Sequence, residues 1–180
     1  MILFDANVLI SLSTGKENDD IFERISGLIQ DLVAAKTIIG VPAPAWAEFL
    51  CGTGLATSDV IQVLKKRSAI RILPFDEVAA TELAFIDQTT RAKGSKKGAS
   101  KSHWQKIKVD RQILATARVL NVTAIYTEDD DLIVEATRLG VTVHRTSEIP
   151  LKPKQNKLDF DSQPPGNETA SARASASLSG

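Results

Sequence analysis

The sequence predicts a three-layer α/β/α fold, in which helices cover both faces of a central parallel sheet of about five strands. Short segments rich in apolar and β-branched residues alternate with longer segments whose apolar residues recur at helical spacing, which is typical of strands alternating with helices. The first residues, MILFDANVLI, run through four apolar side chains directly into Asp5. Such a run is typical of a buried central strand that delivers an acid to the carboxyl edge of a parallel sheet, where ligands bind.

The elements follow in a regular order along the chain. Five segments predict strands: residues 1–4, 37–41, 70–75, 123–126 and 141–144. Seven segments predict helices: residues 8–13, 21–35, 45–50, 57–67, 76–91, 109–120 and a last helix that ends at 139. Pro42 ends the second strand, Pro44 suits the first turn of a helix, and Gly140 suits the end of the last helix. Right-handed crossovers then bring the carboxyl ends of the strands to one edge.

Length and composition predict one domain with a substantial core. The chain has 180 residues, of which 43% are hydrophobic, and we assign residues 1–149 to the domain. The polar tail, residues 150–180, has too few apolar side chains to offset its ordering entropy, so we expect it to be disordered. Lys plus Arg and Asp plus Glu both number 22, a balance that neither favours nor excludes a nucleic-acid partner.

The sequence favours a soluble, cytoplasmic protein. Its single cysteine, Cys51, excludes an internal disulfide framework. No apolar run approaches the ~20 residues that span a bilayer. No basic segment precedes the first apolar run, so we expect neither a signal peptide nor contact with a membrane.

Residues 92–108 differ in character from the rest of the chain. They combine glycines and serines with His103, Trp104 and the lysines Lys93, Lys96, Lys97, Lys101, Lys106 and Lys108. This composition predicts a basic, mobile loop before the helix over 109–120.

Four acids are expected at the carboxyl edge of the sheet: Asp5, Glu48, Asp110 and Asp129. Two of them follow strands, and the other two lie early in helices. Each has an ordinary explanation, as a helix cap, as a favourable charge near a helix N-terminus, or as a solvated turn residue. Together they would repel and raise each other's pKa, a cost that a bound cation relieves. Oxygen ligands without a His–Cys set favour Mg²⁺ or Mn²⁺ over Zn²⁺.

Four motifs surround these positions: DANVLI at 5–10, PAWAEFL at 44–50, KVDRQILATARVL at 108–120 and IYTEDD at 125–130. In these motifs and their order the chain resembles a known family, the PIN-domain ribonucleases, and in particular the VapC-type toxins of bacterial and archaeal toxin–antitoxin pairs. The resemblance covers about residues 1–147. It implies a PIN-like, Rossmann-like fold and RNA hydrolysis that leaves a 5′-phosphate and a 3′-hydroxyl.

The resemblance also implies roles for individual residues. The metal-binding catalytic acids match Asp5, Glu48, Asp110 and Asp129, while Asn7 and Thr127 match polar positions beside them. Asp130 and Asp131 leave open which acid after the fourth strand binds metal. We expect the basic loop to contact the RNA backbone, and Trp104 to stack on an unpaired base. The candidate contact residues are Lys96, Lys97, Lys101, Trp104 and Lys106. The alternative is a merely solvated loop with Trp104 packed on the domain.

Two other functions compete with this hypothesis. A haloacid-dehalogenase-like phosphatase, another Mg²⁺-dependent phosphohydrolase, needs a second acid two residues after its nucleophilic Asp, and Asn7 stands there instead. A catalytically silent PIN-like module would bind RNA or protein without cleavage, although all four acids are present. The toxin hypothesis adds an antitoxin that covers the site, and a homodimer formed by apolar residues of the helices between Ile21 and Leu64.

Overall fold

The computed structural model describes residues 1–16, 19–53, 70–98 and 102–152. Five strands form one sheet in the order β3-β2-β1-β4-β5, and every neighbouring pair is parallel. The strands are β1 (Ile2–Phe4), β2 (Ile39–Pro42), β3 (Ile70–Leu73), β4 (Ile125–Tyr126) and β5 (Val143–His144). The predicted five-strand parallel sheet is thus confirmed.

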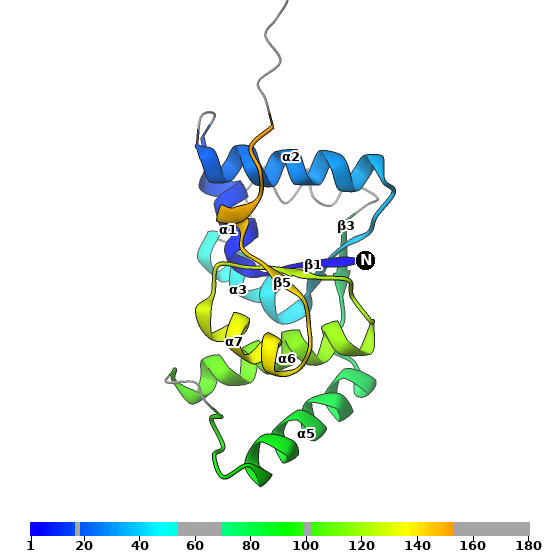
Figure 1. Ribbon diagram of the computed structural model, residues 1–180, viewed down its shortest axis with the longest axis vertical. Coiled ribbons are helices and arrows are strands. Elements are labelled where there is room, and N and C mark those ends of the chain that lie inside the picture. The colour runs from blue at the N-terminus through cyan, green and yellow to red at the C-terminus, as the bar shows by residue number, and fades with distance from the viewer. Residues whose placement is uncertain (17–18, 54–69, 99–101, 153–180) are drawn as a thin grey trace, which may run out of the picture.

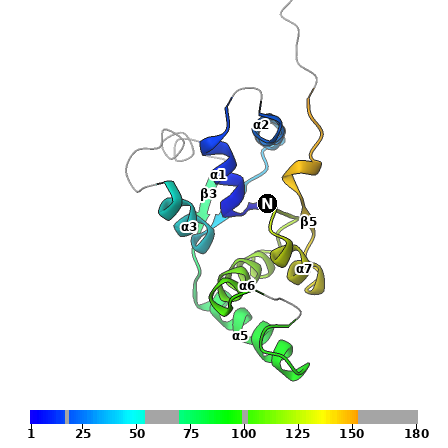
Figure 2. The same ribbon diagram turned by 90° about the vertical axis from the view of Figure 1, so that its left-hand side faces the viewer.

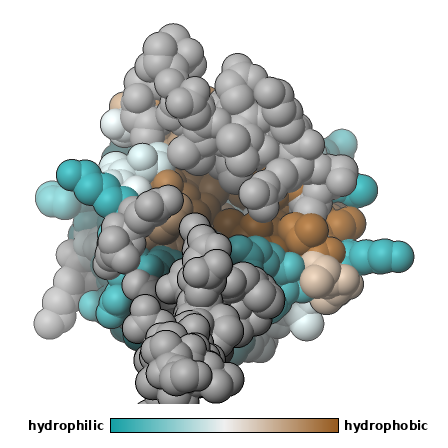
Figure 3. All heavy atoms as spheres, turned by 90° about the horizontal axis from the view of Figure 1, so that it is seen from above, coloured by the Kyte–Doolittle hydropathy of each residue, from teal (hydrophilic) through white to brown (hydrophobic). Residues whose placement is uncertain are grey.

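Helices cover both faces of the sheet and complete the three-layer α/β/α fold. The described helices are α1 (Ala6–Thr14), α2 (Asp20–Ala34), α3 (Ala43–Thr53), α5 (Glu77–Ala92), α6 (Trp104–Val119), α7 (Asp130–Arg138) and the 3-10 helix η1 (Thr146–Glu148). In Figure 1, α2 lies on one side of the sheet, and α5, α6 and α7 lie on the other. Seen from the α2 side, apolar and hydrophilic residues share the surface (Figure 3).

The core forms around β1, the central strand. Leu3 and Phe4 are fully buried between β2 and β4, and each such side chain contributes roughly 1.5–3 kcal/mol by leaving water. Gly40 of β2 permits this close packing, since a Cβ there would lie 2.5 Å from Leu73 Cδ1 and 2.7 Å from Leu3 Cδ2. The chain therefore fixes the end of β1, and with it Asp5, in the interior.

The largest departure from the sequence predictions concerns the basic segment. The loop prediction over 92–108 was wrong at its C-terminal end, because α6 begins at Trp104. The helical repeat there runs through Trp104, Ile107, Arg111 and Leu114, of which the last three are buried. A charged residue in the buried row and lysines on the exposed face conceal the repeat in the sequence. Lys106 consequently lies on a helix, one turn before Asp110.

Arg111 explains how a charge can occupy that buried row. Its side chain has no exposed surface, and it donates to Glu135 of α7, to Asp87 of α5 and to the Lys96 carbonyl. A buried guanidinium is tolerated when carboxylates and carbonyls accept its donors. The contacts join three helices and the loop before α6, and thereby hold the helix that carries Asp110.

Two other predictions concern residues that the structure does not describe. The helix expected over 57–67 lies outside the described residues, as does the tail from residue 153 onward. In the part of the chain that the structure describes, no helix is long and apolar enough to cross a membrane.

Candidate functional site

The candidate site lies at the carboxyl edge of the sheet, where strand order reverses between β1 and β4. Figure 2 looks onto this edge, with α1, α3, α6 and α7 arranged around it. β2 and β3 lie on one side of β1, and β4 and β5 lie on the other. Asp5 follows β1 directly, and Asp129 follows β4 after two intervening residues. Such a reversal opens a crevice that α/β proteins use for ligands.

Asp5 is buried and held by three hydrogen bonds. Its Oδ1 accepts the Ala6 N–H at 2.7 Å and caps α1. Its Oδ2 accepts the Asn7 amide at 3.0 Å and the Thr127 hydroxyl at 2.8 Å. Because a carboxylate offers about four lone pairs, capping and a place in the site are compatible. The first helix cap and the first acid of the site are the same residue.

Asn7 and Thr127 lie beside Asp5 and Asp129. The Asn7 amide donates to Thr127 Oγ1 at 2.9 Å, and Asn7 Oδ1 accepts the Glu128 N–H at 3.3 Å. Thr127 Oγ1 also accepts the Asp129 N–H at 3.0 Å. These bonds tie the end of β1 to the end of β4, and so fix the two acids relative to each other.

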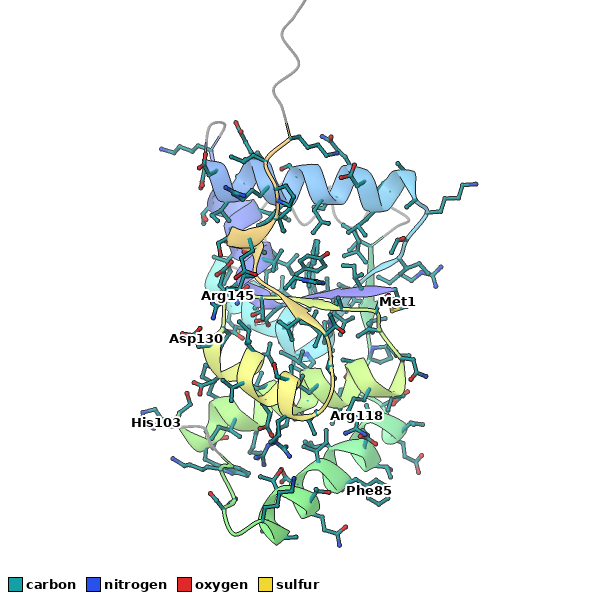
Figure 4. The ribbon with its side chains drawn as sticks, in the orientation of Figure 1. Met1, Phe85, His103, Arg118, Asp130 and Arg145 are labelled. Carbon is teal, nitrogen blue, oxygen red and sulfur yellow. The ribbon has the colours of Figure 1, made fainter. Side chains whose placement is uncertain are left out.

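The three consecutive acids after β4 take different directions. Asp129 Oδ1 caps α7 by accepting the Asp131 and Leu132 N–H groups, while its Oδ2 lies 2.6 Å from Lys106 Nζ. Asp131 Oδ2 lies 3.6 Å from the same ammonium. Asp130 has an 84% exposed side chain that pairs with Arg145, and both residues are labelled in Figure 4. Asp129 and Asp131 therefore face the site, and Asp130 does not.

Asp110 projects to the same place from α6, with its Oδ2 3.6 Å from Lys106 Nζ. It lies in the second turn of the helix rather than at the start, where the sequence had placed it. The field of a helix terminus falls off within the first turn, so the helix dipole does not account for an acid here. Glu48 likewise lies in the second turn of α3, but at the exposed rim of the site.

The carboxylates of the site share one electrostatic field. The pKa of Asp110 is raised from 3.8 to about 7, chiefly by burial; the charges of Asp129 and Asp5 also raise it, and Lys106 lowers it. Burial also raises the pKa of Asp5. The pKa of Glu48 is raised by burial and then by Asp5 and Asp129, which places Glu48 within the field of both acids. Such a cluster favours a positive charge at its centre.

Lys106 supplies a positive charge in this structure, a role that the sequence analysis missed. Burial alone would lower its pKa, but the bond to Asp129 and the surrounding carboxylates raise it. The four-residue spacing to Asp110 would have revealed the contact had the start of α6 been recognised. As the described side chains stand, no three Asp, Glu, His or Cys residues are arranged to hold a metal ion. The acids that face Lys106 still provide the hard oxygen donors that Mg²⁺ or Mn²⁺ requires.

The basic segment makes contacts within the domain. Lys96 Nζ lies 4.1 Å from the centroid of the Trp104 ring, and the Arg111 guanidinium carbon lies 5.7 Å from it. Lys97 donates to the Ser102 carbonyl at 3.0 Å, and Lys101 lies outside the described residues. Trp104 thus packs on the domain, although the exposed Lys96 and Lys97 remain close to solvent. His103 lies on the outside, at the start of α6 (Figure 4).

Comparison with known proteins identifies the family. The model of the PIN domain family matches residues 2–137, and the chain belongs to this family. No curated protein sequence matches it significantly.

Among the solved structures that contain chains of similar fold are two VapBC structures. One is VapBC2 from Rickettsia felis bound to a DNA fragment from its promoter, with 13% identity, coverage of 81% of this chain and 98% of that chain, and a TM-score of 0.56. The other is DNA-bound VapBC from Salmonella typhimurium, with 17% identity, coverage of 81% and 97%, and a TM-score of 0.54. At these identities the similarity establishes the fold alone.

Proposed function

We propose that the protein is a Mg²⁺- or Mn²⁺-dependent endoribonuclease that hydrolyses RNA phosphodiester bonds. The observation that carries the proposal is the gathering of Asp5, Asp110 and Asp129, with Glu48 at the rim, where strand order reverses. Helix capping accounts for Asp5 and Asp129 individually, but it does not account for the buried Asp110 beside them. Membership of the PIN domain family supports the same activity.

Individual residues would have different roles in metal binding and hydrolysis. Asp5, Asp110 and Asp129 would hold the metal ion, with Asp131 close by, and Glu48 would orient the attacking water from the solvent side. Asn7 and Thr127 keep the Asp5 carboxylate in one orientation. The bound ion supplies charge neutralisation of the phosphodiester and a water of lowered pKa. Without it, the acids would repel the anionic substrate.

RNA would approach over the exposed lysines of the segment before α6. Lys96 and Lys97 are exposed, and lysine contacts to phosphates make binding dependent on salt. Trp104 would stack on a base only after Lys96 leaves its ring face.

We further propose a toxin role in the cytoplasm, with an antitoxin that covers the acidic site. The similarity of this chain to chains of the two VapBC structures supports this role. A homodimer through α2 would cover apolar surface such as Val33, which is 42% exposed.

An RNA cleavage assay tests the activity. Labelled RNA is incubated with the wild-type protein in Mg²⁺ and in EDTA, and in Mg²⁺ with Asp5→Asn. Asp130→Asn is the matched control, since it makes the same change at an exposed acid. We expect cleavage only with Mg²⁺, a loss of about 100-fold or more in Asp5→Asn, and near-wild-type activity in the control.

The same assay separates the alternatives. Equal cleavage by Asp5→Asn and the wild type would refute the proposed site. RNA binding without cleavage in any metal would favour a silent binding module. Hydrolysis of a small phosphate monoester but not of RNA would favour another phosphohydrolase.

A further inference from the structure

We propose that Lys106 is a built-in exchangeable cation: its ammonium neutralises the acids of the metal-free protein and leaves when a divalent ion binds. Lys106 therefore lowers the affinity of the site for that ion. The proposal rests on the proposed metal-dependent function and adds a residue that regulates it.

The contacts of Lys106 carry the inference. Its Nζ lies 2.6 Å from Asp129 Oδ2 and 3.6 Å from both Asp110 Oδ2 and Asp131 Oδ2. The three carboxylates come from two helices, α6 and α7, and the charge of Asp5 acts on the same cluster. A lysine ammonium is a compact point charge with three donors, and here it faces three acids. It occupies the place toward which these acids would direct a metal ion.

Within this cluster the lysine is partly exposed, whereas Asp129 and Asp5 are held by hydrogen bonds to other groups of the protein. The Lys106 side chain is 41% exposed and has a flexible four-carbon stem. Asp129 is held by two N–H groups of α7, and Asp5 is held by Ala6, Asn7 and Thr127. Metal binding would therefore displace the ammonium into solvent while the carboxylates stay near their positions. The exchange needs no opening of the core.

The exchange has a thermodynamic consequence. If the ammonium fills the site in most metal-free molecules, the apparent dissociation constant of the metal exceeds the intrinsic one by the inverse of the free fraction. Removing the ammonium should then tighten metal binding by about 10-fold, which corresponds to a site that is free in about a tenth of the molecules. It should also leave the metal-free acids mutually repulsive, and so lower the melting temperature in EDTA.

Direct metal binding tests the proposal on the full chain. The free Mn²⁺ signal in electron paramagnetic resonance gives the dissociation constant for wild type, Lys106→Gln and Lys108→Gln. Lys108 lies on the same helix and is exposed, so its variant removes the same charge outside the cluster. We expect Lys106→Gln to bind Mn²⁺ about 10-fold more tightly than both other proteins do. Its melting temperature should be lower in EDTA and should rise more when Mn²⁺ is added.

A second measurement needs no variant and covers the case in which Lys106→Gln fails to fold. Lysine acetylation of the wild type is followed by mass spectrometry in EDTA and in saturating Mg²⁺. The released Lys106 ammonium should react several-fold faster in Mg²⁺, whereas Lys108 should react equally in both.

The outcomes distinguish the two proposals. The exchange would be refuted if Lys106→Gln and Lys108→Gln bound the metal equally well, or if the rate of Lys106 acetylation did not depend on bound Mg²⁺. Neither result would contradict the proposed nuclease activity. If no divalent ion binds to any of these proteins and RNA is not cleaved, the proposed function fails and the exchange fails with it.

Discussion

Asp110 should destabilise the metal-free protein, and Asp110→Asn should relieve the cost. Burial, together with the charges of Asp129 and Asp5 and against the opposing charge of Lys106, raises the pKa of this acid from 3.8 to about 7. A tenfold change in proton affinity corresponds to about 1.4 kcal/mol, so ionisation in the folded state costs at most about 4 kcal/mol. Water reaches 12% of the side chain and screens part of this. We therefore expect Asp110→Asn to raise the free energy of unfolding by about 2–3 kcal/mol at pH 8.

The sign of the pH dependence follows from the same displacement. Between about pH 4 and pH 7 the folded protein keeps a proton on Asp110 that the unfolded chain has lost. Stability from this group is therefore lost as pH rises through that window. Asp5 contributes in the same direction, whereas the lowered pKa values of Glu128 and Glu135 contribute in the opposite one. The difference between wild type and Asp110→Asn isolates the Asp110 part.

Urea denaturation in EDTA between pH 4.5 and pH 8.5 measures this difference. The gain in free energy of unfolding should be small at the acid end and rise to its full value by pH 8. Asp130→Asn, at an 84% exposed acid, should change stability by less than about 0.5 kcal/mol at every pH. A gain of equal size at pH 5 and pH 8, or a loss at pH 8, would refute the reasoning.

Three further perturbations follow from the contacts around the site. Thr127→Val removes a hydroxyl that serves Asp5, Asn7 and Asp129; it should lower the free energy of unfolding by about 1–3 kcal/mol in urea denaturation and weaken Mn²⁺ binding by about 10-fold in paramagnetic resonance titrations. Arg111→Met leaves buried carboxylate surface without its guanidinium and should lower the free energy of unfolding by about 3–5 kcal/mol; the 58% exposed Arg91 supplies the control Arg91→Met, with an expected change below about 1 kcal/mol. Lys97→Gln should reduce the slope of log affinity for RNA against log salt by up to about 1, measured by anisotropy with Asp5→Asn as the inactive background.

The sheet and the convergence of the acids were predictable from sequence because both depend on local patterns. The buried strands are short and apolar, and β1 runs straight into Asp5. Parallel strands joined by helices bring their carboxyl ends together whatever the loop sequences are. Asp5, Asp110 and Asp129 could therefore be expected at one edge without knowledge of any contact between them.

The start of α6 and the role of Lys106 were not predictable in the same way. Arg111 can be buried because Glu135 and Asp87, which come from other helices, pair with its guanidinium. A search for apolar residues at helical spacing does not count an arginine as a buried residue, so it misses the first turns of α6. The different directions of Asp129, Asp130 and Asp131 arise from the α7 cap and from Arg145. The α7 cap and the position of Arg145 depend on the tertiary structure. The sequence of three consecutive acids therefore does not show which of them faces the site.

The coupling between Lys106 and Asp110 decides whether the acids act as one cluster or as separate surface charges. An exposed pair four residues apart on a helix contributes about 0.3–0.5 kcal/mol, whereas groups in one enclosed network couple by about 0.5–3 kcal/mol. Asp110 is buried and Lys106 faces two more acids, so a double-mutant cycle of Lys106→Gln and Asp110→Asn should give about 1 kcal/mol at pH 8 in EDTA. Removing the lysine should then cost less once Asp110 is neutral, because fewer charges need it. A coupling free energy below about 0.3 kcal/mol would show that solvent screens each acid separately. The acids would then not act together in attracting a cation.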